Sequence, residues 1–374
     1  MLQVNDPKIL RPDVTVTELR EDVPRLRERF AVAASSQDLE RRAWKKSVDS
    51  IHINTNVIIN GVARFNQMLD NVAAEIEGDC LIIPAPSGAG KSHLLARLQK
   101  NSLLAPFSDE TGPVRPLVFI KAPSPCTLKT LGLSLYKSMT GDDLSANLRE
   151  HDIWSRVVSQ MHAQLVSVLI IDEFHHTLRG RTSDERRTLV ETLKNLVIPN
   201  PEDPLLSPGA VTRPICLVLS GMPWLRQVLK EDFQLVRRRA VVSIKPLDHT
   251  GPGVKKAEKF LSLVEPKLGF PDPSGLSDPD MVQRMLKASS GYTGRMMHLI
   301  KKAAFRAIDQ GAPCIDQTKH LAFVFEEIFE VGARRNPFLV PNISICPKIK
   351  EAEFDTLTRL VGMGEDKTPA DDVS

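Results

Sequence analysis

The feature that most constrains the fold is an apolar segment followed by a loop of small residues and then a helical pattern. Residues 80–84 read Cys-Leu-Ile-Ile-Pro, residues 85–92 read Ala-Pro-Ser-Gly-Ala-Gly-Lys-Ser, and an apolar helical repeat follows from residue 93. This order predicts a buried strand, a phosphate-binding loop and a helix. The backbone N–H groups of such a loop, with the N-terminal end of the next helix, form an anion site suited to nucleotide phosphates. The alternative is a Gly/Ser-rich turn that happens to join a strand to a helix.

Individual residues of this loop have predicted roles in binding ATP. The residues expected to surround the nucleotide are Pro86, Ser87, Gly88, Ala89, Gly90, Lys91 and Ser92. Lys91 is expected to reach the β- and γ-phosphates, and the Ser92 hydroxyl to hold Mg²⁺. Ala85 departs from the usual pattern, which has glycine at that position. Alanine is compatible with the loop if its φ angle is negative.

Length and composition set the frame for these motifs. The 374 residues are enough for one large or two medium domains, and the 42% hydrophobic and 25% charged residues are those of an ordinary soluble protein. No apolar run approaches the ~20 residues that span a bilayer, and the N-terminus lacks a signal pattern, so we expect a cytoplasmic protein with no membrane partner. The net charge of +3 permits a nucleic-acid partner without requiring one.

The five cysteines show no spacing typical of a disulfide framework or a zinc site. They are Cys80, Cys126, Cys216, Cys314 and Cys346. We predict that they are small buried hydrophobic residues.

Further apolar runs predict the other strands of a parallel sheet. They lie at residues 117–121, 168–171, 215–220 and 240–245, with helical patterns between them. The second run ends in Asp172 and Glu173, so both carboxylates are expected at the nucleotide edge of the sheet. Asp172 would orient Mg²⁺ through its water shell, and Glu173 would polarise the attacking water. Ser220 ends the next run and is expected beside Glu173 and the γ-phosphate.

Two clusters near the second strand have more than one interpretation. His175 and His176 suggest a metal site, but ATP hydrolysis needs no such ligand and no other Cys or His lies at a suitable spacing. We interpret this pair as polar loop residues beside the phosphate site. Arg179 and Arg181 are either solvated surface charges or part of a loop that faces DNA.

Two further arginine motifs can complete a nucleotide site. Arg237, Arg238 and Arg239 form a cluster in which Arg237 or Arg238 can act on a neighbouring subunit's γ-phosphate as an arginine finger. The alternative is that they satisfy helix C-terminal carbonyls at the surface. Arg295 follows Gly294 at the start of a helix, where it can close a helical lid over the nucleotide or simply begin the helix.

The predicted organisation has four parts. Residues 1–50 form an N-terminal arm for partner docking with a possible helix at 37–47, and residues 51–246 form the α/β nucleotide-binding domain. Residues 247–333 form a small all-α lid domain, and residues 334–374 form a flexible C-terminal tail. The proline-rich segment 199–214 reads as an insertion within the sheet domain.

These motifs occur in the order seen in AAA+ ATPases, over about residues 60 to 330. Within that class the chain resembles transposition regulators of the TniB/TnsC type. The residues that carry this resemblance are Ile-Ile-Asp-Glu-Phe-His at 170–175, Leu-Ser-Gly-Met-Pro at 219–223, Gln-Leu-Val-Arg-Arg at 234–238 and Asn-Pro-Phe at 336–338. Ala85, Ser220 and the 199–214 insertion depart from the pattern of the subfamily.

The resemblance implies a function as well as a fold. Such bacterial proteins assemble on double-stranded DNA as ATP-bound homo-oligomeric rings or helical filaments, recruit a DDE transposase, meet a TniQ-like target-selection protein at one end, and disassemble when ATP is hydrolysed. The DNA contacts that it implies are Lys121, Thr127, Lys129, Lys137 and Thr140. They would meet phosphates without reading bases. A solvated helix face is the alternative for Lys129 and Lys137.

Two other functions stay open at this stage. An AAA+ replication initiator or loader would share the nucleotide site but normally carries a winged-helix DNA-binding domain. A non-hydrolysing nucleotide-dependent scaffold would have no use for the carboxylate of Glu173.

Overall fold

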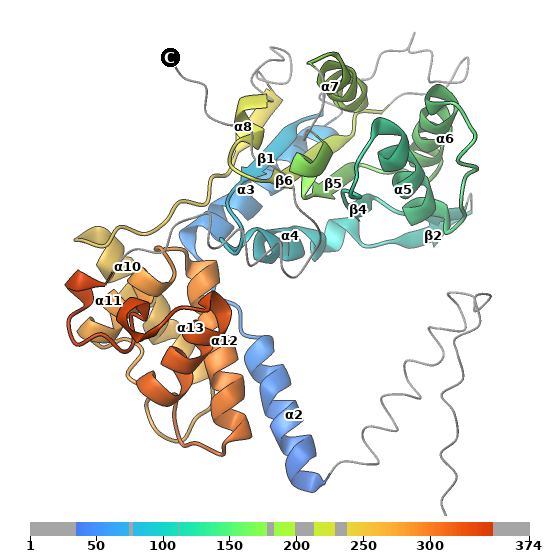
Figure 1. Ribbon diagram of the computed structural model, residues 1–374. Helices are drawn as coiled ribbons and strands as arrows, with labels where there is room; N and C mark the ends of the chain where they lie inside the picture. Colours follow the sequence, from blue (N-terminus) through green and yellow to red (C-terminus); the bar gives the residue numbers. More distant parts are fainter. Residues whose placement is uncertain are drawn as a thin grey trace, which may run out of the picture.

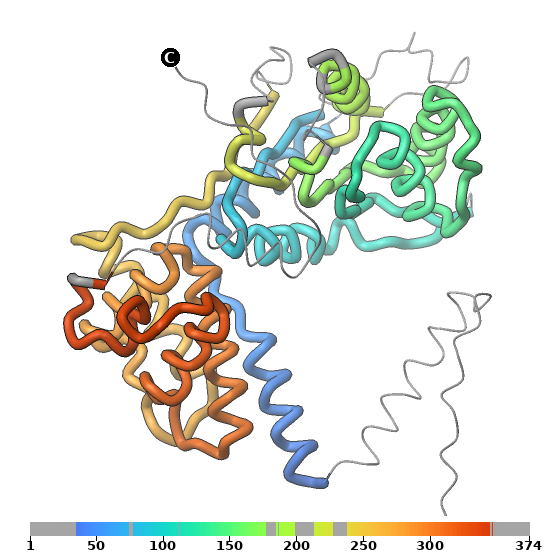
Figure 2. Tube along the Cα trace, in the orientation of Figure 1, coloured from blue at the N-terminus to red at the C-terminus, as the bar shows by residue number. Residues whose placement is uncertain are grey.

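The computed structural model describes residues 35–74, 78–110, 112–177, 183–198, 213–228 and 238–346. Two units are visible in Figure 1: an α/β unit around a central sheet, and a helical unit beside it. The N-terminal helix α2 (Ser36–Asp49) runs along the helical unit, which the chain trace in Figure 2 also shows.

The central sheet has five parallel strands in the order β4-β5-β6-β1-β7. These strands are β1 (Cys80–Pro84), β4 (Leu117–Lys121), β5 (Val168–Asp172), β6 (Cys216–Gly221) and β7 (Arg239–Val241). The predicted parallel sheet is confirmed, although β7 is shorter than the run at 240–245 suggested. A small antiparallel pair, β2 (Phe107–Asp109) and β3 (Gly112–Val114), was not predicted.

Helices cover both faces of the sheet because its strands are apolar on both sides. Cys80 and Ile82 of β1 belong to a core shared with α5, α6 and α7, whereas Leu81 and Ile83 belong to a core shared with α3 and α4. The helices of this unit are α3 (Asn56–Ala73), α4 (Lys91–Gln99), α5 (Leu128–Thr140), α6 (Glu150–Ala163), α7 (Ser183–Val197) and α8 (Leu225–Val228). Short 3₁₀ turns lie at Ser102–Leu104 and Phe174–Thr177.

The helical unit begins after β7. Its elements are α10 (Pro252–Val264), α11 (Pro279–Ala288), α12 (Thr293–Asp309), a π-helical turn (Gln317–Ala322) that continues into α13 (Phe323–Phe329), and 3₁₀ turns at Glu265–Lys267, Ala333–Arg335 and Ile343–Ile345. The helical character expected for residues 247–333 is confirmed.

The N-terminal boundary differs from the prediction. The helix expected at 37–47 forms as part of α2, but α2 packs on the helical unit. Val48, Ile51 and Ile53 are buried in the core of that unit, and the Trp44 indole Nε1 donates a hydrogen bond of 2.7 Å to the Leu268 carbonyl. Residue 50 therefore does not divide an arm from a domain, because apolar side chains on both sides of it share one core. Residues 1–34 lie outside the described residues.

The start of the predicted flexible tail is also packed. Asn336 and Phe338 are almost fully buried on the helical unit, and Asn336 Nδ2 donates to the Ala322 carbonyl at 2.8 Å. The buried Arg284 guanidinium donates to the carbonyls of Pro337 (2.6 Å) and Val340 (2.8 Å). The prediction of flexibility is therefore wrong for residues 334–346, because an apolar side chain and paired carbonyls fix them. Residues 347–374 lie outside the described part.

Four of the five cysteines are buried, as predicted, and Cys314 is partly exposed. Burial raises the pKa of Cys80 to about 12 and that of Cys216 to about 11, because the thiolate loses hydration. Among the described helices, none is both long and apolar enough to cross a membrane.

Candidate nucleotide site

The loop between β1 and α4 has the backbone that an anion site requires. Gly88 and Gly90 have φ angles of 70° and 112°, which side-chain-bearing residues rarely adopt. Gly90 is the N-cap of α4 and offers no capping side chain, so the first N–H groups of the helix face the loop. Outside glycine, the described residues with positive φ are Leu165, Glu173, Ser290 and Glu330. Ala85 is not among them, which confirms that alanine is tolerated there.

Lys91 is folded back onto the loop. Its side chain is 6% exposed, and Nζ donates to the carbonyls of Ala85 (2.8 Å) and Pro86 (3.1 Å). Ser92 is exposed one residue later on the first turn of α4. The ammonium and the hydroxyl are thus at the mouth of the loop, where phosphate oxygens and Mg²⁺ would lie.

Asp172 and Glu173 lie at the carboxyl edge of the sheet. Asp172 is paired with Lys121 across β4 and β5, and its Oδ1 accepts a 2.8 Å hydrogen bond from the Glu173 N–H. In a parallel sheet this is the edge from which the phosphate loop also leaves β1. The topology therefore brings both predicted carboxylates to the edge that carries the loop.

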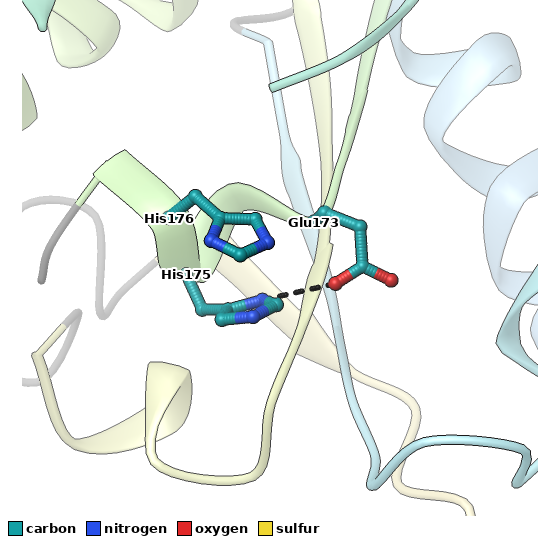
Figure 3. Close-up of side chains that lie close together, drawn as sticks. All are labelled: Glu173, His175 and His176. Carbon is teal, nitrogen blue, oxygen red and sulfur yellow. Dashed lines mark ion pairs between the residues drawn. The ribbon is translucent and has the colours of Figure 1, made fainter. Parts of the chain in front are cut away.

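The Glu173 carboxylate has a partner that the sequence analysis did not assign to it. Its Oε2 lies 3.2 Å from His175 Nδ1, and the dashed line in Figure 3 marks this pair. The backbone of Glu173 has a φ of 54°, so the chain turns sharply straight after β5. The adjacent residues His175 and His176 were the only sign of this contact in the sequence. Their spacing from Glu173 does not show that the chain turns back and brings the His175 ring to the carboxylate.

Ser220 lies where a sensing residue was predicted, next to Ile83 of β1. It is fully buried, and its hydroxyl makes no hydrogen bond to the described residues. A buried hydroxyl without a partner costs stability, so such groups are usually retained for a reason. An oxygen of a bound phosphate or a water molecule would satisfy it.

The start of α12 packs directly on the phosphate loop. A Cβ on Gly294 would lie 2.3 Å from the Gly88 carbonyl oxygen and 2.6 Å from the Gly90 nitrogen, so only glycine fits. Arg295 is 5% exposed, donates from Nε to the Ser87 carbonyl at 3.0 Å, and lies 4.7 Å above the Tyr292 ring. The predicted lid arginine therefore touches the loop from the same chain. The role of Gly294 as a contact surface was not predicted.

Arg238 and Arg239 lie at the opposite, amino end of the sheet. Arg239 pairs with Cys80, the first residue of β1, whereas the phosphate loop follows Pro84 at the other end of that strand. Arg238, immediately before β7, is therefore remote from the phosphate loop of its own chain. Arg237 lies outside the described residues.

The five predicted DNA contacts do not form one cluster. Lys121 and Thr127 are exposed near the start of α5, with Lys129 partly exposed beside them. Thr127 Oγ1 caps α5 by accepting the Thr130 N–H at 2.9 Å. Lys137 is two helical turns away, about 12 Å along the axis from Lys129, and pairs with Asp143 at 2.8 Å. Thr140 Oγ1 donates to the Tyr136 carbonyl at 3.0 Å. Arg179 and Arg181 lie outside the described residues.

His93 follows Ser92 on α4 and lies among side chains that carry or can carry positive charge. Its ring centroid is 4.7 Å from that of His52, and burial together with His52, Arg97 and Lys301 lowers its pKa to about 4. These side chains come from α4 (His93), from α12 (Lys301) and from the segment before α3 (His52). The neutral imidazole is therefore the form present at neutral pH.

Comparison with known proteins agrees with this geometry. Residues 76–229 match the family model of the AAA domain. This part of the chain, less than half of its length, is similar to AAA domains. With its parallel five-stranded sheet and helical C-terminal part, the chain has an AAA+ P-loop fold.

Similar solved structures share little sequence with it. The ADP form of the ORC2 protein of Aeropyrum pernix is 15% identical with a TM-score of 0.50, and the match covers 78% of this chain and 75% of that one. The structure of the ADPNP-ADP complexes of the same protein is 17% identical with a TM-score of 0.50, and the match covers 78% of this chain and 75% of that one. The structure of Drosophila ORC bound to DNA is 15% identical with a TM-score of 0.47, and the match covers 88% of this chain and 72% of that one. The two matches to the ORC2 protein establish a shared fold and no more. No curated protein sequence matches this chain significantly.

The site fits a magnesium nucleotide on three observations. The positive φ angles of Gly88 and Gly90 give the loop the backbone of an anion site, the buried Lys91 ammonium faces the loop, and the Ser220 hydroxyl has no hydrogen-bond partner among the described residues. Ser92 and Asp172 supply the oxygen ligands that Mg²⁺ prefers.

Proposed function

We propose that this protein is an ATP-dependent DNA-binding regulator of transposition. It would form homo-oligomers on double-stranded target DNA, link a TniQ-like target-selection protein to a DDE transposase, and leave the DNA when ATP is hydrolysed. The observation that carries the nucleotide part is the meeting of the phosphate loop, the Asp172–Glu173 edge and Arg295 in one place. The sequence resemblance to TniB/TnsC regulators supports the transposition part.

The proposed ATPase roles follow from position and chemistry. Lys91 exchanges its loop carbonyls for phosphate oxygens, Ser92 and Asp172 hold Mg²⁺, and Glu173 orients the attacking water. Bound Mg²⁺ supplies charge neutralisation between the β- and γ-phosphates. Ser220 would sense the γ-phosphate. The ADP and ADPNP forms of the Aeropyrum pernix ORC2 protein support nucleotide as the ligand of this fold.

Oligomerisation is part of the proposal because the arginine cluster is remote from its own loop. Arg238 and Arg239 lie at the amino edge of the sheet. An arginine finger from this edge, Arg237 or Arg238, would therefore complete the site of a neighbouring copy rather than its own. ATP binding would then favour assembly, since it supplies the phosphate that the finger contacts.

DNA binding is assigned to the start of α5. Lys121, Thr127 and Lys129 are grouped there, whereas Lys137 and Thr140 are engaged within α5 and the loop that follows. Contacts from these side chains reach phosphates, so binding would be weakly sequence-specific and would fall steeply with salt.

A replication initiator or loader is the second candidate, and one observation favours it. The Aeropyrum pernix ORC2 protein, an origin-recognition protein by name, shares the fold over 75% of its chain. The two functions differ in the partner: a loader acts on a helicase, and a transposition regulator on a transposase.

Electron microscopy with duplex DNA and a slowly hydrolysed ATP analogue tests the proposal. We expect rings or filaments around DNA for the wild type. Lys91→Ala should lose them, whereas Lys100→Ala, the same change at an exposed lysine that ends α4, should keep them. Glu173→Gln should slow ATP turnover by about 10²-fold or more and keep assemblies on DNA in ATP, with Glu150→Gln as the matched control. Assemblies that persist in Lys91→Ala, or unchanged ATP turnover in Glu173→Gln, would contradict the proposed control of DNA binding by ATP.

A further inference from the structure

Three side chains with metal-binding atoms meet on the turn that follows β5. Glu173, His175 and His176 each offer a ligand atom, and these atoms all lie within 4.8 Å of one another. Figure 3 shows the Glu173 carboxylate directed toward the two imidazole rings, which overlap beside it. We propose that these three residues form a binding site for a divalent transition metal ion, of the Zn²⁺ class, separate from the predicted Mg²⁺ site.

The backbone holds the three side chains on one side of the turn. Glu173 has a φ of 54°, its carbonyl accepts the His176 N–H at 3.0 Å, and its own N–H is held by Asp172 Oδ1. A left-handed conformation at a residue other than glycine costs on the order of 1 kcal/mol and persists only where its surroundings fix it. The strained backbone at Glu173 therefore fixes the positions from which the three side chains leave the turn before any ion binds.

The His175 ring is also held in place. His175 is 4% exposed, and its ring meets the edge of Trp224 with centroids 6.0 Å apart. A Cβ on Gly221 would come within 3.3 Å of His175 Nδ1, so the floor of the site is tightly packed. His176 stacks on His175 with centroids 4.2 Å apart and an interplanar angle of 33°. The Glu173 side chain is 27% exposed, which leaves a path for an ion.

Distances between the ligand atoms suit a tetrahedral ion. Zn²⁺ binds imidazole nitrogen and carboxylate oxygen at about 2.0–2.2 Å, so two neighbouring ligand atoms of a tetrahedral site lie about 3.3–3.5 Å apart. The Glu173 Oε2 to His175 Nδ1 distance of 3.2 Å is close to this value. His176 needs a rotation about its side-chain bonds to complete the set, and its partial exposure allows this.

Ligand chemistry separates this site from the one for Mg²⁺. Two imidazoles with one carboxylate favour Zn²⁺, Co²⁺ or Ni²⁺ over Mg²⁺, which prefers oxygen ligands. Three protein ligands also leave a fourth position for water. No third Cys or His lies at a suitable spacing in the sequence, but the third ligand is the glutamate itself.

Occupation of this site would inhibit ATP hydrolysis, and this step rests on the proposed function. A metal ion bound to the Glu173 carboxylate prevents that oxygen from orienting the attacking water. The site would thus couple the availability of a transition metal to the turnover of the nucleotide switch, while nucleotide binding through Lys91 and Ser92 stays intact.

Binding is tested on the nucleotide-free full chain with Co²⁺ as the spectroscopic probe and Zn²⁺ as the competitor. We expect one equivalent of Co²⁺ to give the intense visible bands of a four-coordinate ion, and Zn²⁺ to bleach them. His176→Ala and Glu173→Gln should each weaken binding at least about tenfold. His52→Ala, which disrupts the His52–His93 pair, is the matched control and should bind as the wild type does. Absence of the bands, or equal affinity in His176→Ala, would overturn the site.

Inhibition is tested separately as the ratio of ATPase rates with and without Zn²⁺ at excess Mg²⁺-ATP. The wild type and His52→Ala should lose about half of their rate at a Zn²⁺ concentration equal to the measured Kd, and His176→Ala, which binds at least about tenfold more weakly, should lose no more than about a tenth there. If Co²⁺ binds but the protein shows no ATPase activity with Mg²⁺-ATP in the absence of Zn²⁺ and Co²⁺, the proposed ATPase activity is refuted and the metal site is not. Normal ATPase activity without Co²⁺ binding would refute the metal site alone.

Discussion

Replacing Gly294 by alanine tests the contact between the helical unit and the phosphate loop. The added Cβ would lie 2.3 Å from the Gly88 carbonyl oxygen, 2.6 Å from the Gly90 nitrogen and 2.7 Å from the Ala89 carbonyl carbon. All three are backbone atoms of the loop, so no side chain can rotate out of the way. Since ordinary contact begins at about 3.4 Å, the start of α12 must withdraw by roughly 1 Å.

The magnitude of the effect is a balance of two terms. Overpacking of this kind costs about 1–3 kcal/mol. Alanine is a better helix former than glycine by about 0.5–1 kcal/mol, which offsets part of the cost in the first turn of α12. We therefore expect a net loss of about 0.5–2 kcal/mol in the free energy of unfolding. Arg295, one residue later, should lose its hydrogen bond to the Ser87 carbonyl.

Urea unfolding at neutral pH measures this loss, and a fluorescent ATP analogue reports the effect on the site. Gly332→Ala is the matched control, because a Cβ there meets nothing within 4 Å. The control should stay within ±0.5 kcal/mol of the wild type. If Gly294→Ala were as neutral as Gly332→Ala, the helical unit would not rest on the phosphate loop as described.

Three further predictions concern single side chains. Ser220→Ala should raise the free energy of unfolding by about 1 kcal/mol in nucleotide-free protein, because it removes a buried hydroxyl without a partner, and should slow ATP hydrolysis; a loss of stability would show that the hydroxyl is already satisfied. Arg284→Met should cost about 2–4 kcal/mol in urea unfolding, because the carbonyls of Pro337 and Val340 lose a buried charged donor; a change below 0.5 kcal/mol would contradict that role. The folded-state pKa of His93, about 4, lies below its unfolded value near 6.5, so its contribution to stability is present above pH 6.5 and is lost as the pH falls toward 4. Unfolding measured between pH 7 and pH 4 should show a weaker decline in His93→Gln than in the wild type, and parallel curves would refute this assignment.

The sheet was predictable because its signal is local. Each of its strands is an apolar run, and a run of this kind can be buried on both faces only in a sheet covered by helices on both sides. Strands β5 and β6 are buried along their whole length in this way. The phosphate loop and the Asp172–Glu173 edge follow from the same runs, since they lie at strand ends. β7 was predicted too long because Val242 and Ile244 are buried beyond the end of the strand, and burial alone gives the apolar pattern that was read as a strand.

Contacts between distant segments were not predictable in this way. Val48, Ile51 and Ile53 are apolar in sequence, but nothing local says that their partners are α10 and α12 rather than the sheet. Asn336 and Phe338 lie in a proline-containing stretch with no helical or strand periodicity, and the contact that holds it comes from Arg284, more than fifty residues earlier. The turn at Glu173 escaped prediction for a related reason, because positive φ at a non-glycine residue has no sequence signature.

The charged groups assigned to ATP already have protein partners in this structure. Lys91 donates to the carbonyls of Ala85 and Pro86, Arg295 to the carbonyl of Ser87, and the Glu173 carboxylate lies against His175. Nucleotide must exchange these contacts rather than fill vacant ones, so the gain from each new phosphate contact is reduced by a hydrogen bond of similar strength. The affinity for nucleotide then depends mainly on the rearrangement of the protein when these contacts are exchanged. Because Arg295 belongs to α12, a shift of its side chain away from the Ser87 carbonyl also involves that helix. A change at the loop is therefore transmitted to the helical unit, which is what a nucleotide-controlled assembly switch requires.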